Sequence, residues 1–376
     1  MTEITSPRVL FLTLYPETMP SSRLRVFQYL PYLREAGIEA TVLPTLPEPW
    51  FSRLYFARSK WPHLFQYMVE AVLGLERILQ SRKYDVVFIQ KGILSTNLRG
   101  FDRLLARAND SLIFDLDDLV FGRSLIEFQS PLLRSLQDPD QTKKISSRAK
   151  AVIVGNQFLK NRALEYNSNV FVIPTPVDTN RFSPKEMPAR KNPNEIVIGW
   201  MGMETTLGYV FPLKEILFKL SRRFPIRLKL ITRLGRWSHP FQGFPVDVVS
   251  WSYETEVQQM ADFDMGIMPL PNEVWSEGKC GLKLLQCMAM KIPSVASATK
   301  ANCDIVEDGK DGFLASTPDE WLEKLSLLIE DEKRRKEMGE RARRKAVENY
   351  SLEKTAPELI EVLRTASQRN PIPAHA

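Results

Sequence analysis

The chain has 376 residues, of which 44% are hydrophobic and 26% are charged, as in soluble globular proteins. This length is sufficient for two domains of ordinary size. The formal net charge of +6 suits an anionic partner, but no nucleic-acid-binding signature accompanies it. No apolar run approaches the roughly 18 residues that span a bilayer, no secretory signal opens the chain, and the three cysteines form no paired framework. We therefore expect a cytoplasmic protein that binds no nucleic acid.

The first half of the chain alternates short apolar strands with helical patterns. A helical pattern with Ser21 or Ser22 as its N-cap follows the first strand, and residues 50–83 are expected to be mainly helical. Successive β-α-β units of this kind imply a parallel sheet. The expected strands, apolar on both faces, cover residues 8–14, 38–43, 85–89, 111–114, 151–154 and 170–173.

The second half repeats this alternation after a proline-rich linker. We therefore predict an α/β fold with two doubly wound Rossmann-like domains that face each other across a cleft. The predicted domains are residues 1–180 and 196–350, with the linker at 181–195 and a C-terminal helix at 351–376 that packs back on the first domain and ends in a tail. The expected strands of the second half cover residues 196–201, 227–231, 246–250, 264–268 and 293–297.

One stretch of the second half, residues 275–297, carries the clearest chemical signal. It reads WSEGKCGLKLLQCMAMKIPSVAS, with Gly278, Lys279, Gly281 and Lys283 ahead of an apolar helical run. A glycine-rich turn that enters a helix presents unpaired N–H groups and the positive end of the helix dipole, and lysines add charge. Lysines at a helix start are electrostatically unfavourable unless an anion is present. The alternative interpretation is that these lysines lie on a solvated helix face. The stretch predicts a phosphate or diphosphate site.

Four segments together resemble the GT4-type (group 1) retaining glycosyltransferases of the two-Rossmann-domain GT-B fold. They read GKCGLKLLQCMAMKIPSVAS, IVIGWMGMETTLGYV, DIVEDGKDGFLAST and VFVIPTPVDTNRFSP, and the resemblance extends over nearly the whole chain. It implies a hexosyltransferase that moves a sugar from a nucleotide-sugar donor to an acceptor hydroxyl, in cell-surface polysaccharide or glycolipid synthesis. The nucleotide sugar would be a co-substrate, with no further cofactor and no required metal. The implied acceptor is a carbohydrate, a lipid-linked molecule or a protein.

The resemblance places the donor in the second domain. Lys279 and Lys283 would neutralise the diphosphate. The family's two glutamates, seven residues apart, fall on Gly278 and Gln286, so Glu277 would take the catalytic role of the first by a small register shift. Gln286 would hydrogen-bond the ribose, or would simply be the polar side of a buried helix. The implied donor residues are Gly202, Glu204, Thr205, Arg233, Gly278, Lys279, Gly281, Leu282, Lys283 and Gln286.

The resemblance places the acceptor in the first domain. The family's histidine falls on Asp117, so a carboxylate would perform any acid/base or oxocarbenium-stabilising work there. The clustered Asp115, Asp117 and Asp118 would raise one another's pKa values. A metal-binding Asp-x-Asp and a loop cap are the alternatives for this cluster, and Arg23 would equally suit a helix flank. The implied acceptor residues are Ser21, Ser22, Arg23 and Asp115.

Residues 50–67 mix seven aromatic side chains with Arg53, Arg58 and Lys60. Such a mixture suits peripheral contact with the inner face of a membrane, or an aromatic lip packed on its own domain.

Two other function classes stay open. One is a binding or scaffold protein that kept the fold without catalysis. The other is a haloacid-dehalogenase-like phosphatase with Asp115 as nucleophile, although Leu119 departs from that signature.

Overall fold

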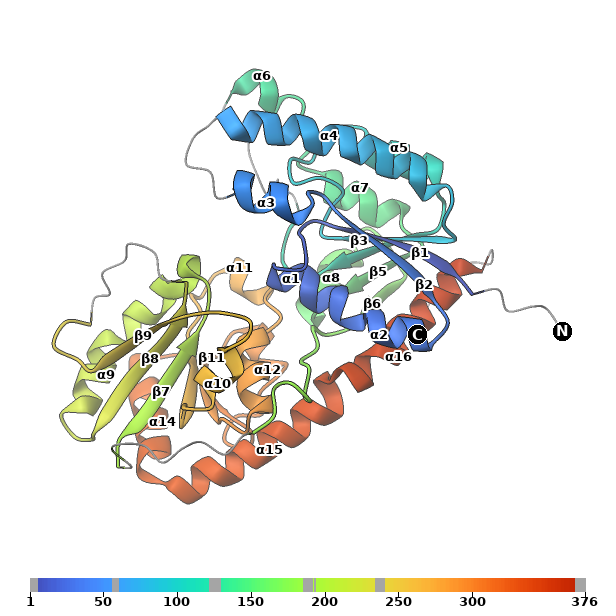
Figure 1. Ribbon diagram of the computed structural model, residues 1–376. Helices are drawn as coiled ribbons and strands as arrows, with labels where there is room; N and C mark the ends of the chain where they lie inside the picture. The colour runs from blue at the N-terminus through green and yellow to red at the C-terminus, as the bar shows by residue number, and fades with distance from the viewer. Residues whose placement is uncertain are drawn as a thin grey trace. The chain divides into compact units, whose positions relative to one another are not determined.

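A computed structural model describes residues 6–55, 61–121, 130–184, 192, 194–233 and 241–368. The chain forms two compact units. Unit 1 comprises Met1–Thr175, Gly278–Cys280 and Thr355–Ala376, and unit 2 comprises Pro176–Glu277 and Gly281–Lys354. Each unit contains one six-stranded parallel sheet (Figure 1). The α/β fold with two doubly wound sheets is therefore confirmed, while the domain borders expected from the sequence stay predictions.

The sheet of unit 1 has the strand order β2-β1-β3-β4-β5-β6. Its four inner strands, β1, β3, β4 and β5, are almost entirely buried and mostly apolar, as a parallel sheet covered on both faces requires, while the edge strands β2 and β6 are partly exposed. The elements are β1 Arg8–Thr13, α1 Pro20–Arg25, the 3-10 helix η1 Phe27–Tyr29, α2 Leu30–Glu35, β2 Glu39–Pro44, α3 Glu48–Tyr55, α4 Trp61–Ser81, β3 Val86–Gln90, α5 Phe101–Ala108, β4 Leu112–Leu116, α6 Pro131–Arg134, α7 Gln141–Arg148, β5 Ala151–Val154, α8 Gln157–Ala163, β6 Val170–Val172 and α16 Leu352–Ser367.

The first helical segment differs from the expected single helix. It is divided into α1, η1 and α2, because Pro31 at the start of α2 has no N–H to continue the helical ladder. The N-cap is Met19, so the prediction of Ser21 or Ser22 was wrong. The Ser22 hydroxyl instead donates to Gln90 Oε1 at 3.1 Å, which ties α1 to the end of β3.

The last helix, α16, contributes from Thr355 onward to unit 1. The hydroxyl of Tyr29 donates to Thr355 Oγ1 at 3.0 Å, and Arg364 Nη2 donates to the carbonyl of Ala36 at 2.7 Å. These contacts join the C-terminal helix to the η1–α2 region of the same unit.

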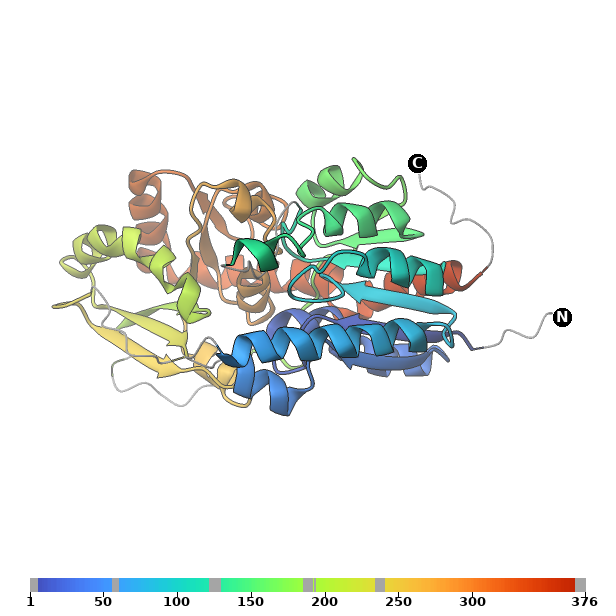
Figure 2. The same cartoon turned by 90° about the horizontal axis from the view of Figure 1, so that it is seen from above.

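The sheet of unit 2 has the order β12-β11-β10-β7-β8-β9. Two apolar clusters lie on its opposite faces, one with α9 and α14 and the other with α12 and α15, and Figures 1 and 2 show helices on both sides of the strands. The elements are β7 Ile196–Met201, the 3-10 helix η2 Glu204–Leu213, α9 Lys214–Ser221, β8 Ile226–Thr232, β9 Val246–Ser250, α10 Glu256–Met260, β10 Met265–Met268, α11 Val274–Glu277, α12 Leu282–Ala289, β11 Ser294–Ser297, α13 Lys300–Cys303, β12 Phe313–Ala315, α14 Pro318–Glu330 and α15 Glu332–Tyr350.

None of the helices within the described ranges has the length and apolarity that crossing a membrane requires. The expected cytoplasmic location stays a prediction.

Candidate active site

Each sheet contains one point at which the strand order reverses. In unit 1 this point lies between β1 and β3, and in unit 2 it lies between β7 and β10. In open parallel sheets, ligands bind beyond the carboxyl ends of the strands at such points. The charged residues that follow these strands are therefore the first candidates for function.

In unit 1, a buried ion pair anchors this edge of the sheet. Arg25 of α1 donates from Nε to both carboxylate oxygens of Asp115, at 3.2 and 3.1 Å, and its Nη2 also contacts this carboxylate. Its Nη1 donates to the carbonyl of Ile173 at 2.7 Å. The two side chains are 2% and 0% exposed. Burial lowers the pKa of Arg25, but the Asp115 charge and hydrogen bonds outweigh it and raise that pKa above its ordinary value.

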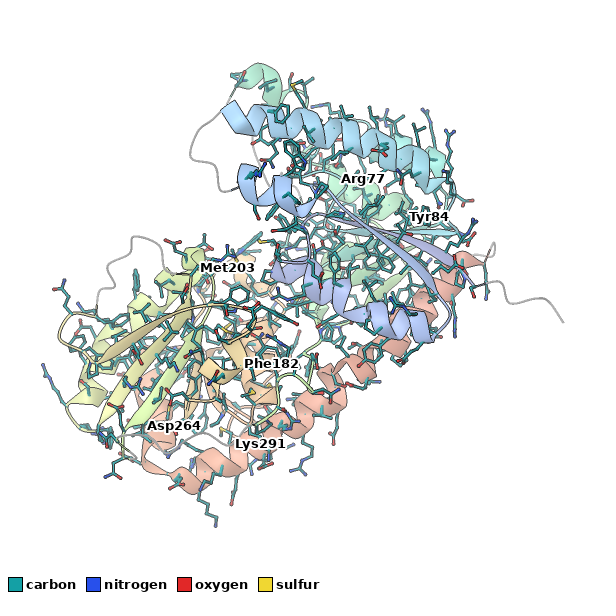
Figure 3. The ribbon with its side chains drawn as sticks, viewed as in Figure 1. Arg77, Tyr84, Phe182, Met203, Asp264 and Lys291 are labelled. Carbon is teal, nitrogen blue, oxygen red and sulfur yellow. The ribbon has the colours of Figure 1, made fainter. Side chains whose placement is uncertain are left out.

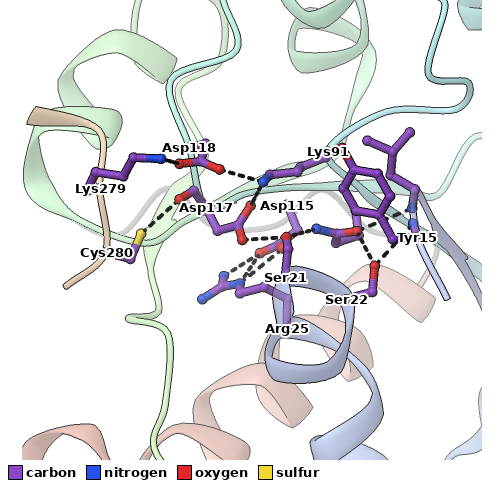
Figure 4. Close-up of polar contacts among 12 residues, drawn as sticks. Tyr15, Ser21, Ser22, Arg25, Lys91, Asp115, Asp117, Asp118, Lys279 and Cys280 are labelled. Atoms are coloured by element: carbon purple, nitrogen blue, oxygen red, sulfur yellow. Dashed lines mark hydrogen bonds and ion pairs between the residues drawn. The ribbon is translucent and has the colours of Figure 1, made fainter. Parts of the chain in front are cut away.

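A chain of hydrogen bonds links three strand ends next to this pair (Figure 4). Gln90 Nε2, at the end of β3, donates to Ser21 Oγ at 2.7 Å, and Ser21 Oγ donates to Asp117 Oδ2 at 2.6 Å. The same glutamine accepts from Leu14 N, just after β1, at 3.3 Å. Asp117 is thus held by a donor from the α1 segment, and Ser21 is the predicted acceptor residue in contact with it.

Lys91 is the residue at this edge that sequence reasoning missed. Its Nζ lies 3.1 Å from Asp117 Oδ1 and 2.5 Å from Asp118 Oδ2, and its side chain is buried. Its φ of 67° lies in the left-handed region that residues other than glycine rarely adopt, and such backbone is retained where the surroundings hold it. Lysine immediately after the strand VVFIQ is the sequence signal that could have identified it.

Lys279 contacts the same cluster. It belongs with unit 1, and its Nζ donates to Asp118 Oδ1 at 2.8 Å. Its carbonyl accepts from Asn156 Nδ2 at 2.9 Å, and the thiol of the neighbouring Cys280 donates to the carbonyl of Asp117 at 3.2 Å (Figure 4). Asp118 therefore lies between two ammonium groups.

The pKa of Asp118 does not follow the expectation that clustered aspartates raise one another's pKa values. Burial would raise the pKa of Asp118, but the charges of Lys91 and Lys279 outweigh it and hold the pKa below its usual range. The expectation of mutually raised pKa values is therefore wrong for this residue. The reason is that the carboxylate of Asp118 contacts both Lys91 and Lys279, whereas the pKa of Asp115 is raised, first of all by its burial.

This lowered pKa makes a prediction for acid stability. A depressed carboxylate stabilises the fold above its unfolded pKa of about 4, and the contribution is lost as the pH falls through the folded pKa. We expect the free energy of unfolding, measured by urea titration, to decline less steeply below about pH 4 in Asp118→Asn than in the wild type. Equal acid dependence of the two proteins would contradict the assignment.

In unit 2, Lys283 lies at the point of strand reversal. Its Nζ donates to Thr206 Oγ1 at 3.2 Å and lies 4.6 Å from the ring centre of Trp200 in β7. A Cβ added to Gly202, just after β7, would lie 2.4 Å from this ammonium, so glycine leaves the room that the lysine occupies. Met203, labelled in Figure 3, follows and is exposed. This geometry places a cation beside the loop that opens η2.

Part of the second half of the chain is similar in sequence to a known protein family. Residues 263–345 match the family described as glycosyl transferases group 1. This segment therefore resembles a group 1 glycosyltransferase domain. A stretch of 80 residues, 20% of the chain, is 26% identical to spore coat protein SA of Bacillus subtilis (strain 168), and the match spans only 21% of that relative.

Solved structures show the same fold along nearly the whole chain. HepE of Anabaena in complex with UDP and glucose superposes with a TM-score of 0.62 at 15% identity, over 95% of this chain and 99% of that one. A glycosyltransferase from Rickettsia africae ESF-5 gives 0.68 at 14% identity, over 97% and 100%. Sucrose-phosphate synthase from Thermosynechococcus elongatus gives 0.67 at 12% identity, over 95% and 98%. The fold is therefore that of GT-B glycosyltransferases, with two Rossmann-like domains.

Within the matched segment, the residues at the glutamate positions have structural partners. The Glu277 carboxylate accepts the backbone N–H of Lys300, at the start of α13, at 2.7 Å. A Cβ on Gly278 would lie 2.9 Å from the backbone nitrogen of Leu119, so no glutamate side chain fits there in this structure. Gln286 is buried on α12, one turn after Lys283. The catalytic role of Glu277 stays a prediction.

The remaining predicted donor residues lie in the same unit. Glu204 and Thr205 open η2, and Arg233 is exposed directly after β8. Gly281 has φ 59° and precedes Leu282, the first residue of α12. The left-handed glycine lets the chain turn into the helix that carries Lys283.

The predicted acceptor residues of unit 1 are not equally placed to meet a ligand. Ser22 and Asp115 are buried, and Asp115 is held by Arg25. Arg23 Nη1 lies 3.4 Å from the carbonyl of Thr18. Ser21 and Asp117 are partly exposed. Direct acceptor contact stays a prediction for all of them, and these two are the better placed.

Proposed function

We propose that this protein is a glycosyltransferase that moves a sugar from a nucleotide-sugar donor to an acceptor hydroxyl, with retention of configuration. The observation that carries this proposal is the placement of Lys283 beside Gly202 and Thr206, at the strand reversal of the unit that contains the matched segment. Negative charge develops on the diphosphate as the sugar leaves. A fixed ammonium stabilises that charge more in the transition state than in the bound donor.

The donor that we propose is a UDP-sugar. Support comes from HepE of Anabaena, which shares the fold and is described in complex with UDP and glucose. The remaining proposed donor ligands are Gln286 for the ribose and Lys279 and Arg233 for the diphosphate. In this structure, Lys279 contacts Asp118.

The acceptor side of the proposal rests on unit 1. Asp117 accepts from Ser21 and contacts Lys91, so its carboxylate is fixed in position at the end of β4. We propose that it stabilises positive charge on the sugar or orients the acceptor hydroxyl, with Ser21 beside it. A carbohydrate, lipid-linked or protein acceptor and a role in polysaccharide or glycolipid synthesis complete the proposal.

The experiment is a calorimetric titration with UDP, followed by a turnover assay with UDP-sugars. We expect UDP to bind and a UDP-sugar to be consumed at an unchanged rate after dialysis against EDTA, because lysines rather than a metal would neutralise the diphosphate. Failure of every nucleoside diphosphate to bind would overturn the proposal. Loss of turnover in EDTA, restored by Mg²⁺, would contradict its metal-independent part.

Two other functions receive less support. A phosphatase would need Asp115 as an exposed nucleophile, whereas its carboxylate is fully buried against Arg25. A scaffold that binds a donor without catalysis would show UDP binding and no turnover with any acceptor. The same titration and assay therefore separate the scaffold from the enzyme.

A further inference from the structure

Helix α4 of unit 1 turns several polar side chains toward the protein interior, beside Ile78, which packs in the apolar core. Gln66, Glu70, Arg77 and Ser81 are all buried on it. Their contacts are with neighbours in the same unit: Gln66 Nε2 donates to Glu70 Oε1 at 2.9 Å, and Arg77 Nη1 donates to the carbonyl of Thr45 at 3.0 Å (Arg77 is labelled in Figure 3). Glu70 also accepts from the hydroxyl of Ser95 at 2.6 Å. The polar side of this helix is thus fixed inward by specific hydrogen bonds.

The opposite face of α4 is apolar and exposed. Its five large side chains recur at spacings of three and four residues, which places them in one stripe along the helix. Their exposed fractions run from 46% for Leu75 to 67% for Val72. We call Phe65, Met68, Val72, Leu75 and Leu79 the outer stripe. A surface helix of a soluble protein ordinarily has the reverse polarity, so a contiguous stripe of this kind marks an interaction surface.

Cations lie near both ends of the outer stripe and on the neighbouring helix α5. Arg82 and Lys83 are exposed directly after its last residue. Exposed Arg103 and Arg107 lie on α5, which packs beside α4 (Figure 1). At the other end, the exposed Trp50 of α3 lies 6.2 Å from the ring of Phe65, and Arg53 of the same helix is exposed.

Few acidic side chains lie on this surface. Glu76 is the one exposed acidic side chain within residues 65–81. Apolar side chains with an aromatic end and flanking cations match the boundary between acyl chains and anionic headgroups. A second copy of the chain would bring the same patch against itself, with cations at both ends of the stripe in either orientation. Like charges across such a contact oppose it.

We propose that the outer stripe of α4 docks on an anionic lipid surface, with the helix parallel to the bilayer. The apolar side chains enter the boundary of the acyl region, and Arg53, Arg82 and Lys83 contact the headgroups. This surface is not the one expected over residues 50–67. Residues 56–60 of that stretch lie outside the described part of the chain, and the outer stripe continues to Leu79. The inference does not depend on the glycosyltransferase proposal.

The test is flotation of the full-length protein with vesicles of phosphatidylcholine, with or without a third of phosphatidylglycerol. The wild type should float with the anionic vesicles and not with the neutral ones. Val72→Gln combined with Leu79→Gln should weaken flotation at least about tenfold, because both side chains lose the gain from entering the apolar layer. Arg82→Gln combined with Lys83→Gln should weaken it by roughly fivefold for each cation.

The matched control is Leu164→Gln, which removes an exposed leucine that lies outside α4 and α5. This variant should float like the wild type, and all variants should keep the wild-type melting temperature. A wild type that stays with the unbound fraction, or a Val72/Leu79 double variant that floats normally, would overturn the proposal. So would a dimer in sedimentation that this double variant dissociates, since a second copy would then cover the stripe.

Discussion

The Arg25→Met variant is expected to lose about 3–5 kcal/mol of the free energy of unfolding. Arg25 and Asp115 are almost completely buried, and Arg25 donates hydrogen bonds to both oxygens of the Asp115 carboxylate. Methionine fills a similar volume, but it leaves the Asp115 carboxylate without its counter-charge. An unpaired buried charge costs far more than the net value of the pair itself. Urea denaturation at neutral pH measures this difference.

Two further variants make the result interpretable. Arg8→Met removes an Arg–Asp pair of the same sheet, but Arg8 and Asp85 are 53% and 38% exposed, so we expect a loss of less than about 1 kcal/mol. Combining Arg25→Met with Asp115→Leu removes both charges and should recover much of the lost stability. If Arg25→Met were no more costly than Arg8→Met, the buried pair would not anchor this edge of the sheet.

The sheets could be predicted from sequence because their strands are short, continuous apolar runs. Residues 151–154 and 196–201 show this most plainly, since both were expected at the observed bounds. β12, Phe313–Ala315, was missed, since its three residues were not recognised as a strand. The helix after β1 was misread because apolar spacing continues through Pro31, while the backbone hydrogen-bond ladder does not.

The candidate site was predictable only where one stretch of sequence carries it. The glycines and lysines of residues 278–283 predict a phosphate site by themselves, and that site stays a prediction. The partners of Asp115 and Asp118 were not predictable, because Arg25 comes from helix α1 and Lys91 from the end of β3, 90 and 27 residues away in sequence. Ion pairs between distant segments leave no periodic signal. Position 278 accommodates glycine because a Cβ there would clash with the backbone of Leu119, a contact that the sequence does not reveal.

Lys283→Ala is expected to reduce kcat of the proposed transferase by about a hundred- to a thousandfold, the usual cost of losing one group that stabilises transition-state charge. UDP should also bind less tightly, because the diphosphate would lose a fixed cation of unit 2. Lys291→Ala is the matched control. It removes a lysine that follows the C-terminal end of α12. The Nζ of Lys291 lies 2.6 Å from Glu340 Oε1 in an exposed ion pair, so kcat should not change. Lys283→Arg should retain part of the rate, since the charge remains while its geometry changes. If Lys283→Ala kept wild-type turnover while Lys291→Ala lost it, the donor would not be bound at the strand reversal of unit 2, and the assignment of Lys283 would be wrong.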